Sequence, residues 1–200
     1  GNYGYVGTGI DTAETVYADL WRFDPASNTW AQMSNMPASV RRNAIAFTID
    51  TKGYVGTGAD SNSASLGTIL DDFWEYDPTS NSWLQKADYP GAGGFGVYHA
   101  TGFAIDNRGF ICAGKSGPDN YVFDLWEYDP SADSWTARTS FPGGDRYALS
   151  SFVVEGKAYV GMGTDHDIYR KDWWEYNPTT LTWTAKADLP GSERSAASTF

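Results

Sequence analysis

Three arginines recur at one position in the sequence and could bind an anion. Arg41, Arg146 and Arg194 each lie four residues after a proline, at the start of a segment rich in small residues. A guanidinium group binds a carboxylate through two parallel hydrogen bonds. Arginines gathered around one opening would therefore recognise a carboxylate or a sulfate. The alternative is structural, with each arginine paired to an aspartate of a neighbouring loop, such as Asp72 or Asp172.

A second candidate site is a short acidic segment with a histidine. Asp165, His166 and Asp167 offer two carboxylates and an imidazole. Calcium prefers oxygen ligands, whereas copper also accepts imidazole. The segment does not have the spacing of a known calcium loop, so a solvated acidic loop is the favoured interpretation. We expect no cofactor, with calcium left open and copper disfavoured.

Four further residues are candidates for ligand binding. Tyr98, His99, Asp60 and Asp119 lie in segments whose length and composition differ from one part of the chain to the next. Variable loops on a rigid scaffold commonly carry function. We therefore expect these residues to lie on the same face as the three arginines.

A fourfold repeat positions these residues. In each unit Trp-x-Tyr or Trp-x-Phe precedes Asp-Pro or Asn-Pro, a second Trp follows nine residues after the first, and a Pro follows seven residues later. The first Trp residues of the units are Trp21, Trp74, Trp126 and Trp174. Two aromatics at spacing two share one face of a strand, and Asp-Pro favours a turn. The repeat predicts a hairpin at long period, as in a propeller or a solenoid.

Two more strand types complete each unit. Apolar segments that end in glycine, such as 54–58, precede the Trp hairpin, and segments rich in small residues, such as 43–47, follow the last Pro. The chain begins on the first type at 3–8 and ends on the second at 195–200. We expect these two segments to pair, because pairing would remove two open sheet edges. Gly94 takes the arginine position in the second unit.

The unit resembles a kelch repeat, with Arg after a Pro, spaced Tyr and Trp, and Gly-Thr-Gly in place of the usual glycine pair. The sequence at 72–78, Asp-Phe-Trp-Glu-Tyr-Asp-Pro, is similar to kelch proteins secreted by Bacteroidetes, and more distantly the chain resembles the central domain of galactose oxidase. The resemblance implies an all-β, kelch-type β-propeller of four four-stranded blades, one of them completed by the N- and C-terminal strands. Residues 1–200 would form one domain, or a four-blade segment of a larger propeller.

Composition excludes several classes of partner. A formal charge of −11 disfavours nucleic acid, and no apolar run is long enough to span a membrane. The single cysteine, Cys112, rules out an internal disulfide. The chain starts at Gly1 without an initiator Met or a signal peptide, so we expect a processed chain or a part of a longer one.

The leading functional hypothesis is a non-catalytic module, extracellular or on the cell surface, which presents its variable loops to a protein or glycan partner. The first alternative is a structural subunit of a homo-oligomer or filament. The second is a kelch-type enzyme. The resemblance to galactose oxidase implies a copper site that would draw on Tyr98, His99, His166 and Cys112, and a kelch-type sugar mutarotase is also left open.

Overall fold

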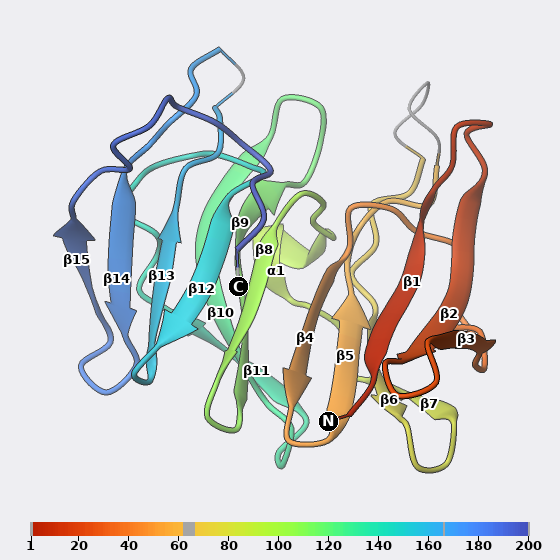
Figure 1. Cartoon of the computed structure of the whole chain (residues 1–200). Coiled ribbons are helices and arrows are strands. Elements are labelled where there is room, and N and C mark those ends of the chain that lie inside the picture. Colours follow the sequence, from red (N-terminus) through yellow and green to blue (C-terminus); the bar gives the residue numbers. More distant parts are fainter. Residues whose placement is uncertain (1, 62–66, 166, 200) are drawn as a thin grey trace.

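The computed structural model describes residues 2–61, 67–165 and 167–199. Four antiparallel sheets follow one another along the chain and lie side by side, from β1–β3 at one side of Figure 1 to β12–β15 at the other. The first sheet comprises β1 (Gly4–Ile10), β2 (Val16–Asp24) and β3 (Thr29–Gln32). The second comprises β4 (Ile45–Ile49), β5 (Lys52–Gly56), β6 (Phe73–Asp77) and β7 (Ser82–Lys86).

The third and fourth sheets have the same order. The third comprises β8 (Thr101–Ile105), β9 (Arg108–Lys115), β10 (Tyr121–Asp129) and β11 (Ser134–Arg138). The fourth comprises β12 (Ser150–Val154), β13 (Lys157–Gly161), β14 (Trp173–Asn177) and β15 (Thr182–Lys186). One short helix, α1 (Gly91–Gly94), lies between β7 and β8 in the described part of the chain. The all-β propeller architecture expected from the repeat is confirmed.

The Trp hairpins form as the repeat predicts. In the fourth sheet Tyr176 lies opposite Trp183, and their ring centroids are 4.9 Å apart. The same pairing occurs once in each of the other sheets. The Asn177 side chain accepts a hydrogen bond from the backbone N–H of Thr179 at 2.9 Å, which is the Asx turn expected where a strand ends at Asn-Pro.

The hydrophobic core lies between neighbouring sheets. Phe73 of the second sheet is 4.9 Å from Trp135 of the third, measured between ring centroids. Phe110 of the third sheet contacts Tyr176 of the fourth in the same way, at 5.9 Å. Large rings fill these interfaces because each buries much apolar area. The aromatic repeat is therefore mainly scaffold.

Each sheet after the first also forms a hydrogen bond to the preceding sheet through its second Trp. The indole N–H of Trp83 donates to the carbonyl oxygen of Ser34, and Trp135 and Trp183 make the equivalent bond in the next two sheets, all at 2.8 Å. Trp30 is the first Trp of this series and is 53% exposed.

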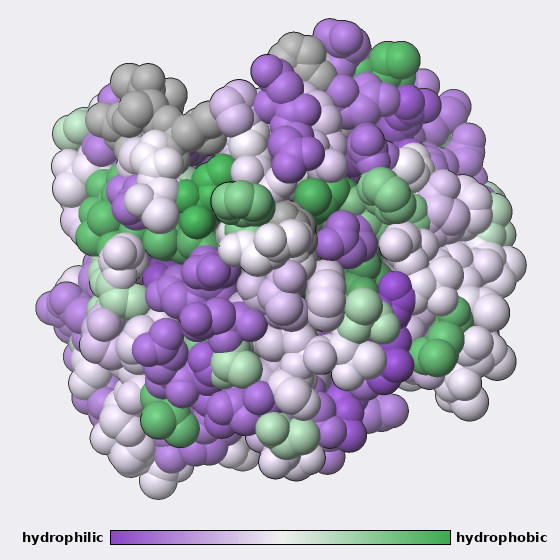
Figure 2. All heavy atoms as spheres, turned by 180° about the vertical axis from the view of Figure 1, so that it is seen from behind, coloured by the Kyte–Doolittle hydropathy of each residue, from purple (hydrophilic) through white to green (hydrophobic). Residues whose placement is uncertain are grey.

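The rear face of the molecule is mostly hydrophilic or intermediate, with its apolar residues in separate groups (Figure 2).

The two ends of the chain do not complete one blade, so that part of the sequence-based prediction is wrong. The first sheet has three strands, β1-β2-β3. The C-terminal segment 195–199 lies instead along β12, where Ala196 N–H donates to Ala148 O at 2.9 Å and Ser150 Oγ to Ala197 O at 2.7 Å. Figure 1 shows this last described segment, in dark blue, running beside β12. The segment 195–199 continues the series of inner segments β4, β8 and β12, in which each packs against the one before it, and its contacts with the fourth sheet hold it there instead of at β1.

Strand direction divides the loops between two faces. The loop face, which is uppermost in Figure 1, contains two kinds of connection. One kind leads into the inner strands, and the other joins the second and third strands of a sheet. The turn face is formed by the hairpin turns after β4, β6, β8, β10, β12 and β14.

Within the residues described, no helix is long and apolar enough to cross a membrane.

Candidate functional site

Two of the three predicted anion-binding arginines are buried in ion pairs. Arg41 is fully buried, and its guanidinium donates to both carboxylate oxygens of Asp72, at 2.9 and 2.7 Å. Arg146 is 3% exposed and donates to Asp172 at 2.6 Å. Both arginines also donate to a backbone carbonyl of the same sheet. They hold a loop to its sheet, which is the structural alternative that the sequence left open.

The third arginine lies at the surface. Arg194 is exposed, and its Nε–H donates to Ser192 O at 3.0 Å. In the second unit the equivalent position belongs to Val97, and the assignment of Gly94 was wrong. The carbonyl of Val97 accepts a backbone bond from Gly58, just as the carbonyl of Arg41 accepts one from Gly9. The extra residues of this unit are taken up in α1, which places Gly94 outside the repeat.

A series of three backbone hydrogen bonds links the starts of the inner segments. His99 N–H donates to Asn43 O at 3.2 Å, Ala148 N–H to His99 O at 2.9 Å, and Ala196 continues the series onto Ala148. All four residues have positive φ, between 52° and 54°. This conformation is uncommon for residues other than glycine. Because it recurs in every unit, the mouth of the propeller axis on the loop face has a fixed backbone.

Tyr98, His99, Tyr121, Tyr147 and Lys115 gather at this mouth, and we call them the mouth cluster. The rings of Tyr98 and His99 have centroids 5.2 Å apart, and those of His99 and Tyr147 are 5.6 Å apart. Tyr121 stacks on Tyr147 at 5.7 Å. The ammonium group of Lys115 lies 4.9 Å and 4.8 Å from the Tyr121 and Tyr147 centroids and 6.0 Å from that of Tyr98. The predicted site residues Tyr98 and His99 therefore belong to one group.

The electrostatics of the mouth cluster keep its histidine neutral. Burial, together with the nearby positive charges of Arg42 and Lys115, lowers the pKa of His99 to about 4. Burial also raises the pKa of the Tyr98 and Tyr121 hydroxyl groups. Near pH 7 the cluster therefore combines a neutral imidazole, which can accept a proton, with phenols that remain protonated.

The remaining predicted residues lie around the mouth on the loop face. Asp60 accepts a hydrogen bond from the backbone N–H of Thr68 at 2.7 Å, which closes its own loop. Asp119 is exposed in the loop that joins β9 and β10. Neither carboxylate contacts the mouth cluster through a hydrogen bond in the described parts of the chain.

In the described part of the acidic segment after β13, the first carboxylate is engaged in an ion pair. Asp165 pairs with Arg170 at 2.5 Å, and the bond from Arg170 lowers the pKa of Asp165. His166 lies outside the described residues, and Asp167 lines a hollow of about 620 Å³ together with Tyr121. Among the residues described, no group of three or more His, Cys, Asp or Glu side chains could hold a metal ion. Calcium binding here stays a prediction, which a chelator-reversible rise in melting temperature would test.

Cys112 lies apart from Tyr98 and His99. It is fully buried in the core between the third and fourth sheets, and burial raises the pKa of its thiol. A residue in this position fills space between sheets. Of the copper-site residues that the structure describes, Cys112 therefore belongs to the core and not to the group formed by Tyr98 and His99.

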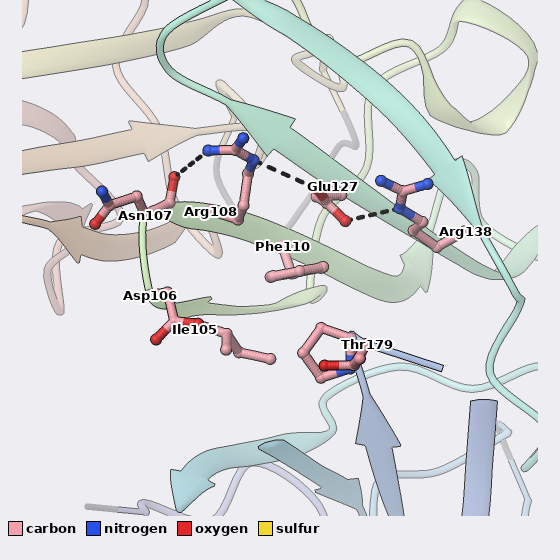
Figure 3. Close-up of a pocket in the computed structure, with 9 residues that line it drawn as sticks. Ile105, Asp106, Asn107, Arg108, Phe110, Glu127, Arg138 and Thr179 are labelled. Atoms are coloured by element: carbon pink, nitrogen blue, oxygen red, sulfur yellow. Dashed lines mark hydrogen bonds and ion pairs between the residues drawn. The ribbon is translucent and has the colours of Figure 1, made fainter. Parts of the chain in front are cut away.

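A second hollow, of about 440 Å³, opens on the turn face between the third and fourth sheets. Figure 3 shows Arg108 and Arg138 on either side of Glu127, above Phe110. Arg138 donates to Glu127 at 2.7 Å, and Arg108 pairs with Glu127 at 3.5 Å and with Asp129 at 2.9 Å. The charged side chains that line this hollow form ion pairs with one another, so they are less suited to bind a ligand than the mouth cluster is.

Sequence reasoning missed three members of the mouth cluster: Lys115, Tyr121 and Tyr147. A comparison of the four units would have found Lys115. It follows the last glycine of its apolar strand, at the position that Ile10, Ala59 and Thr164 occupy in the other units. A lone cation at one position of an internal repeat departs from what the scaffold requires, and such a departure indicates a functional residue.

Curated relatives that share one name align with most of the chain. The N-acetylneuraminate epimerase of Haemophilus influenzae (strain PittEE) is 24% identical over 197 residues, covering 77% of this chain and 51% of the relative. N-acetylneuraminate epimerase 2 of Escherichia coli O6:H1 is 24% identical over 212 residues, covering 80% and 56%. An F-box/kelch-repeat protein of Arabidopsis thaliana is 34% identical over 86 residues, covering 43% and 18%. The chain spans about half the length of the epimerases it matches.

The fold has a counterpart among solved structures. The structure of YjhT superposes with a TM-score of 0.78 and 18% sequence identity, over 96% of this chain and 64% of that chain. No protein-family profile matches the sequence.

These relatives overturn the leading functional hypothesis. A non-catalytic binding module was expected, and with it the absence of enzymatic activity. Relatives that align with 77–80% of the chain carry the name of an enzyme. The kelch-type sugar enzyme, which the sequence left as an alternative, is the better-supported interpretation.

Proposed function

The chain is a kelch β-propeller, and on that basis we propose that it takes part in the epimerisation of N-acetylneuraminate, or of a closely related sugar acid, at the anomeric carbon. The observation that carries this proposal is the alignment of N-acetylneuraminate epimerases with 77–80% of the chain. The mouth cluster is the proposed site of reaction. The chain spans only about half the length of those relatives. That the whole protein catalyses this epimerisation is therefore also proposed.

The chemistry of the reaction fits the groups at the mouth. Exchange between anomers opens the sugar ring, so the anomeric hydroxyl must lose a proton and the ring oxygen must gain one. His99, with a pKa of about 4, is the proposed base, since its imidazole is unprotonated near neutral pH. The hydroxyl groups of Tyr98 and Tyr121, whose pKa values are raised by burial, are the proposed proton donors. General acid–base catalysis of this kind contributes about 10²–10⁴-fold to a rate.

Anomer exchange can be measured directly. Two-dimensional exchange NMR on N-acetylneuraminate at pH 7 would compare the rate of interconversion with and without the protein. We expect His99→Asn to lower the protein-dependent rate at least about 100-fold. Asparagine is chosen because it tolerates the positive φ of this position, so that the backbone hydrogen bonds of His99 are kept.

Controls separate catalysis from folding. Thr180→Ala, in a hairpin turn on the opposite face, should leave the rate unchanged. Near-UV circular dichroism should be the same for all variants. An exchange rate with wild-type protein equal to the rate in buffer would overturn the proposal.

Partners beyond the substrate remain proposals. The similarity to an F-box/kelch-repeat protein supports a fold that also binds proteins, and a glycan partner would here be the sugar acid itself. Self-association is open to light scattering. An extracellular or cell-surface location stays a prediction.

A further inference from the structure

We propose that Lys115 recognises the carboxylate of the sugar acid, and that Tyr98, Tyr121 and Tyr147 hold its ammonium group in position at the mouth of the propeller. The inference rests on the proposed function and adds a specificity-determining residue to it.

The first argument is the unusual environment of this one cation. Most lysine and arginine side chains that the structure describes are paired with carboxylates, as expected in a chain of net charge −11. Lys115 makes no ion pair within the described residues, and its ammonium lies on three tyrosine rings instead. Asp119, in the adjoining loop, does not pair with it either. A cation without an anionic partner in an acidic protein is suited to an anionic ligand.

The second argument is the way the cation is held. Lys115 ends β9 and Tyr121 begins β10, whereas Tyr98 and Tyr147 precede the inner strands β8 and β12. Residues from two neighbouring sheets thus fix one ammonium group. A lysine has three N–H donors, and ring faces attract its charge without using those donors as a carboxylate would. The group is positioned in advance, and its donors can still bind a carboxylate.

The third argument concerns the substrate. In N-acetylneuraminate the carboxylate is bonded to the anomeric carbon, so the residue that binds the carboxylate must lie close to the residue that acts on the anomeric hydroxyl. Lys115 and His99 share two ring neighbours, Tyr98 and Tyr147. A carboxylate at Lys115 would therefore bring the reacting carbon to the proposed base. Neutral sugars would lack this anchor.

Binding of the acid and of its methyl ester tests the proposal independently of turnover. NMR titration of the intact chain would give the affinity for N-acetylneuraminate and for its uncharged methyl ester. The charge-assisted hydrogen bond should make the acid bind about 10- to 100-fold more tightly, with a preference that falls as salt is added. Lys115→Met should remove the preference, and Lys115→Arg should restore part of it.

Matched variants separate recognition from folding and from net charge. Lys157→Met removes one positive charge from the turn face and should leave the preference intact. Tyr147→Leu should weaken it by freeing the ammonium group, whereas Tyr147→Phe keeps the ring face and should not.

The two proposals fail in different ways. Anomer exchange by the wild type with an acid preference that survives in Lys115→Met would overturn the role of Lys115 alone. A Lys115-dependent preference without any exchange would support carboxylate recognition and overturn the proposed reaction. Equal affinity of the wild type for acid and ester would overturn the inference.

Discussion

The turn between β14 and β15 contains a leucine that the fold does not favour. Leu181 has a φ of 58°, and the equivalent turn residues Asn28, Asn81 and Asp133 have φ values of 54°, 51° and 48°. Asn and Asp tolerate this left-handed conformation, whereas a leucine there costs about 1 kcal/mol. We predict that Leu181→Asn stabilises the protein.

The size of the gain follows from the other turns. Asn81 Oδ1 accepts hydrogen bonds from the Tyr76 hydroxyl and from the backbone N–H of Ser34, both at 2.9 Å. The corresponding hydroxyl, that of Tyr176, is buried without a partner in the described structure. A hydrogen bond to the Tyr176 hydroxyl should add about 1 kcal/mol to the free energy of unfolding, and relief of the backbone strain at residue 181 should add about as much. Leu181 is already 39% exposed, so the loss of its apolar contacts offsets only part of this.

Denaturant unfolding would measure the effect. A net gain of about 1–2 kcal/mol in the free energy of unfolding is expected, which corresponds to a rise of roughly 2–8 °C in melting temperature. A double-mutant cycle with Tyr176→Phe isolates the hydrogen bond. If Leu181→Asn were equally stabilising in the Tyr176→Phe background, the hydroxyl would not be the cause. No stabilisation in either background would refute the reasoning altogether.

Further predictions concern the buried arginine, the acid range and the histidine. Arg41→Ala should lower the free energy of unfolding by about 3 kcal/mol, because it leaves the charge of Asp72 uncompensated. Arg194→Ala should change the free energy of unfolding by less than about 0.5 kcal/mol. Equal losses for the two variants in urea unfolding would contradict a structural role that is specific to Arg41. Hydrogen bonds, the largest from Lys186, lower the pKa of Glu175 to about 2, so its stabilisation is present above the usual carboxyl pKa and is lost as pH falls towards 2. Glu175→Gln should therefore lose less melting temperature than the wild type between pH 6 and pH 2, and parallel profiles would argue against the pairing. Anomer exchange that depends on the protein should be flat from pH 7 to pH 5 and fall with a midpoint near the His99 pKa of about 4; the same fall in the residual rate of His99→Asn would remove His99 from the role of base.

The local structure of each unit could be predicted from the sequence because short-range chemistry determines it. Alternation in Trp-x-Tyr fixes which faces meet, and Asn-Pro fixes where the strand turns, as at Asn177. Closure could not be predicted in this way. The segment 195–199 follows the inner-strand pattern whether or not it meets β1, and its contact with the start of β12 depends on how whole sheets are arranged.

The candidate site was predictable in part for the same reason. Tyr98 and His99 were found because they are adjacent in a variable loop. Lys115 and Tyr147 are separated by 32 residues in the sequence, and their contact depends on how two sheets pack. For Arg41 the two interpretations differed only in whether Asp72 reaches it, a question that spacing alone leaves open.

The series of backbone hydrogen bonds that links Asn43, His99, Ala148 and Ala196 has a consequence for how this protein can change. Its links are main-chain N–H and C=O groups, so the fold does not depend on which side chains these residues carry, provided they accept a positive φ. The four positions already carry an amide, an imidazole and two methyl groups. The four positions are therefore suited to substitution, where a library of Asn, Asp, His and Gly could alter the chemistry of the mouth while the propeller beneath it stays the same.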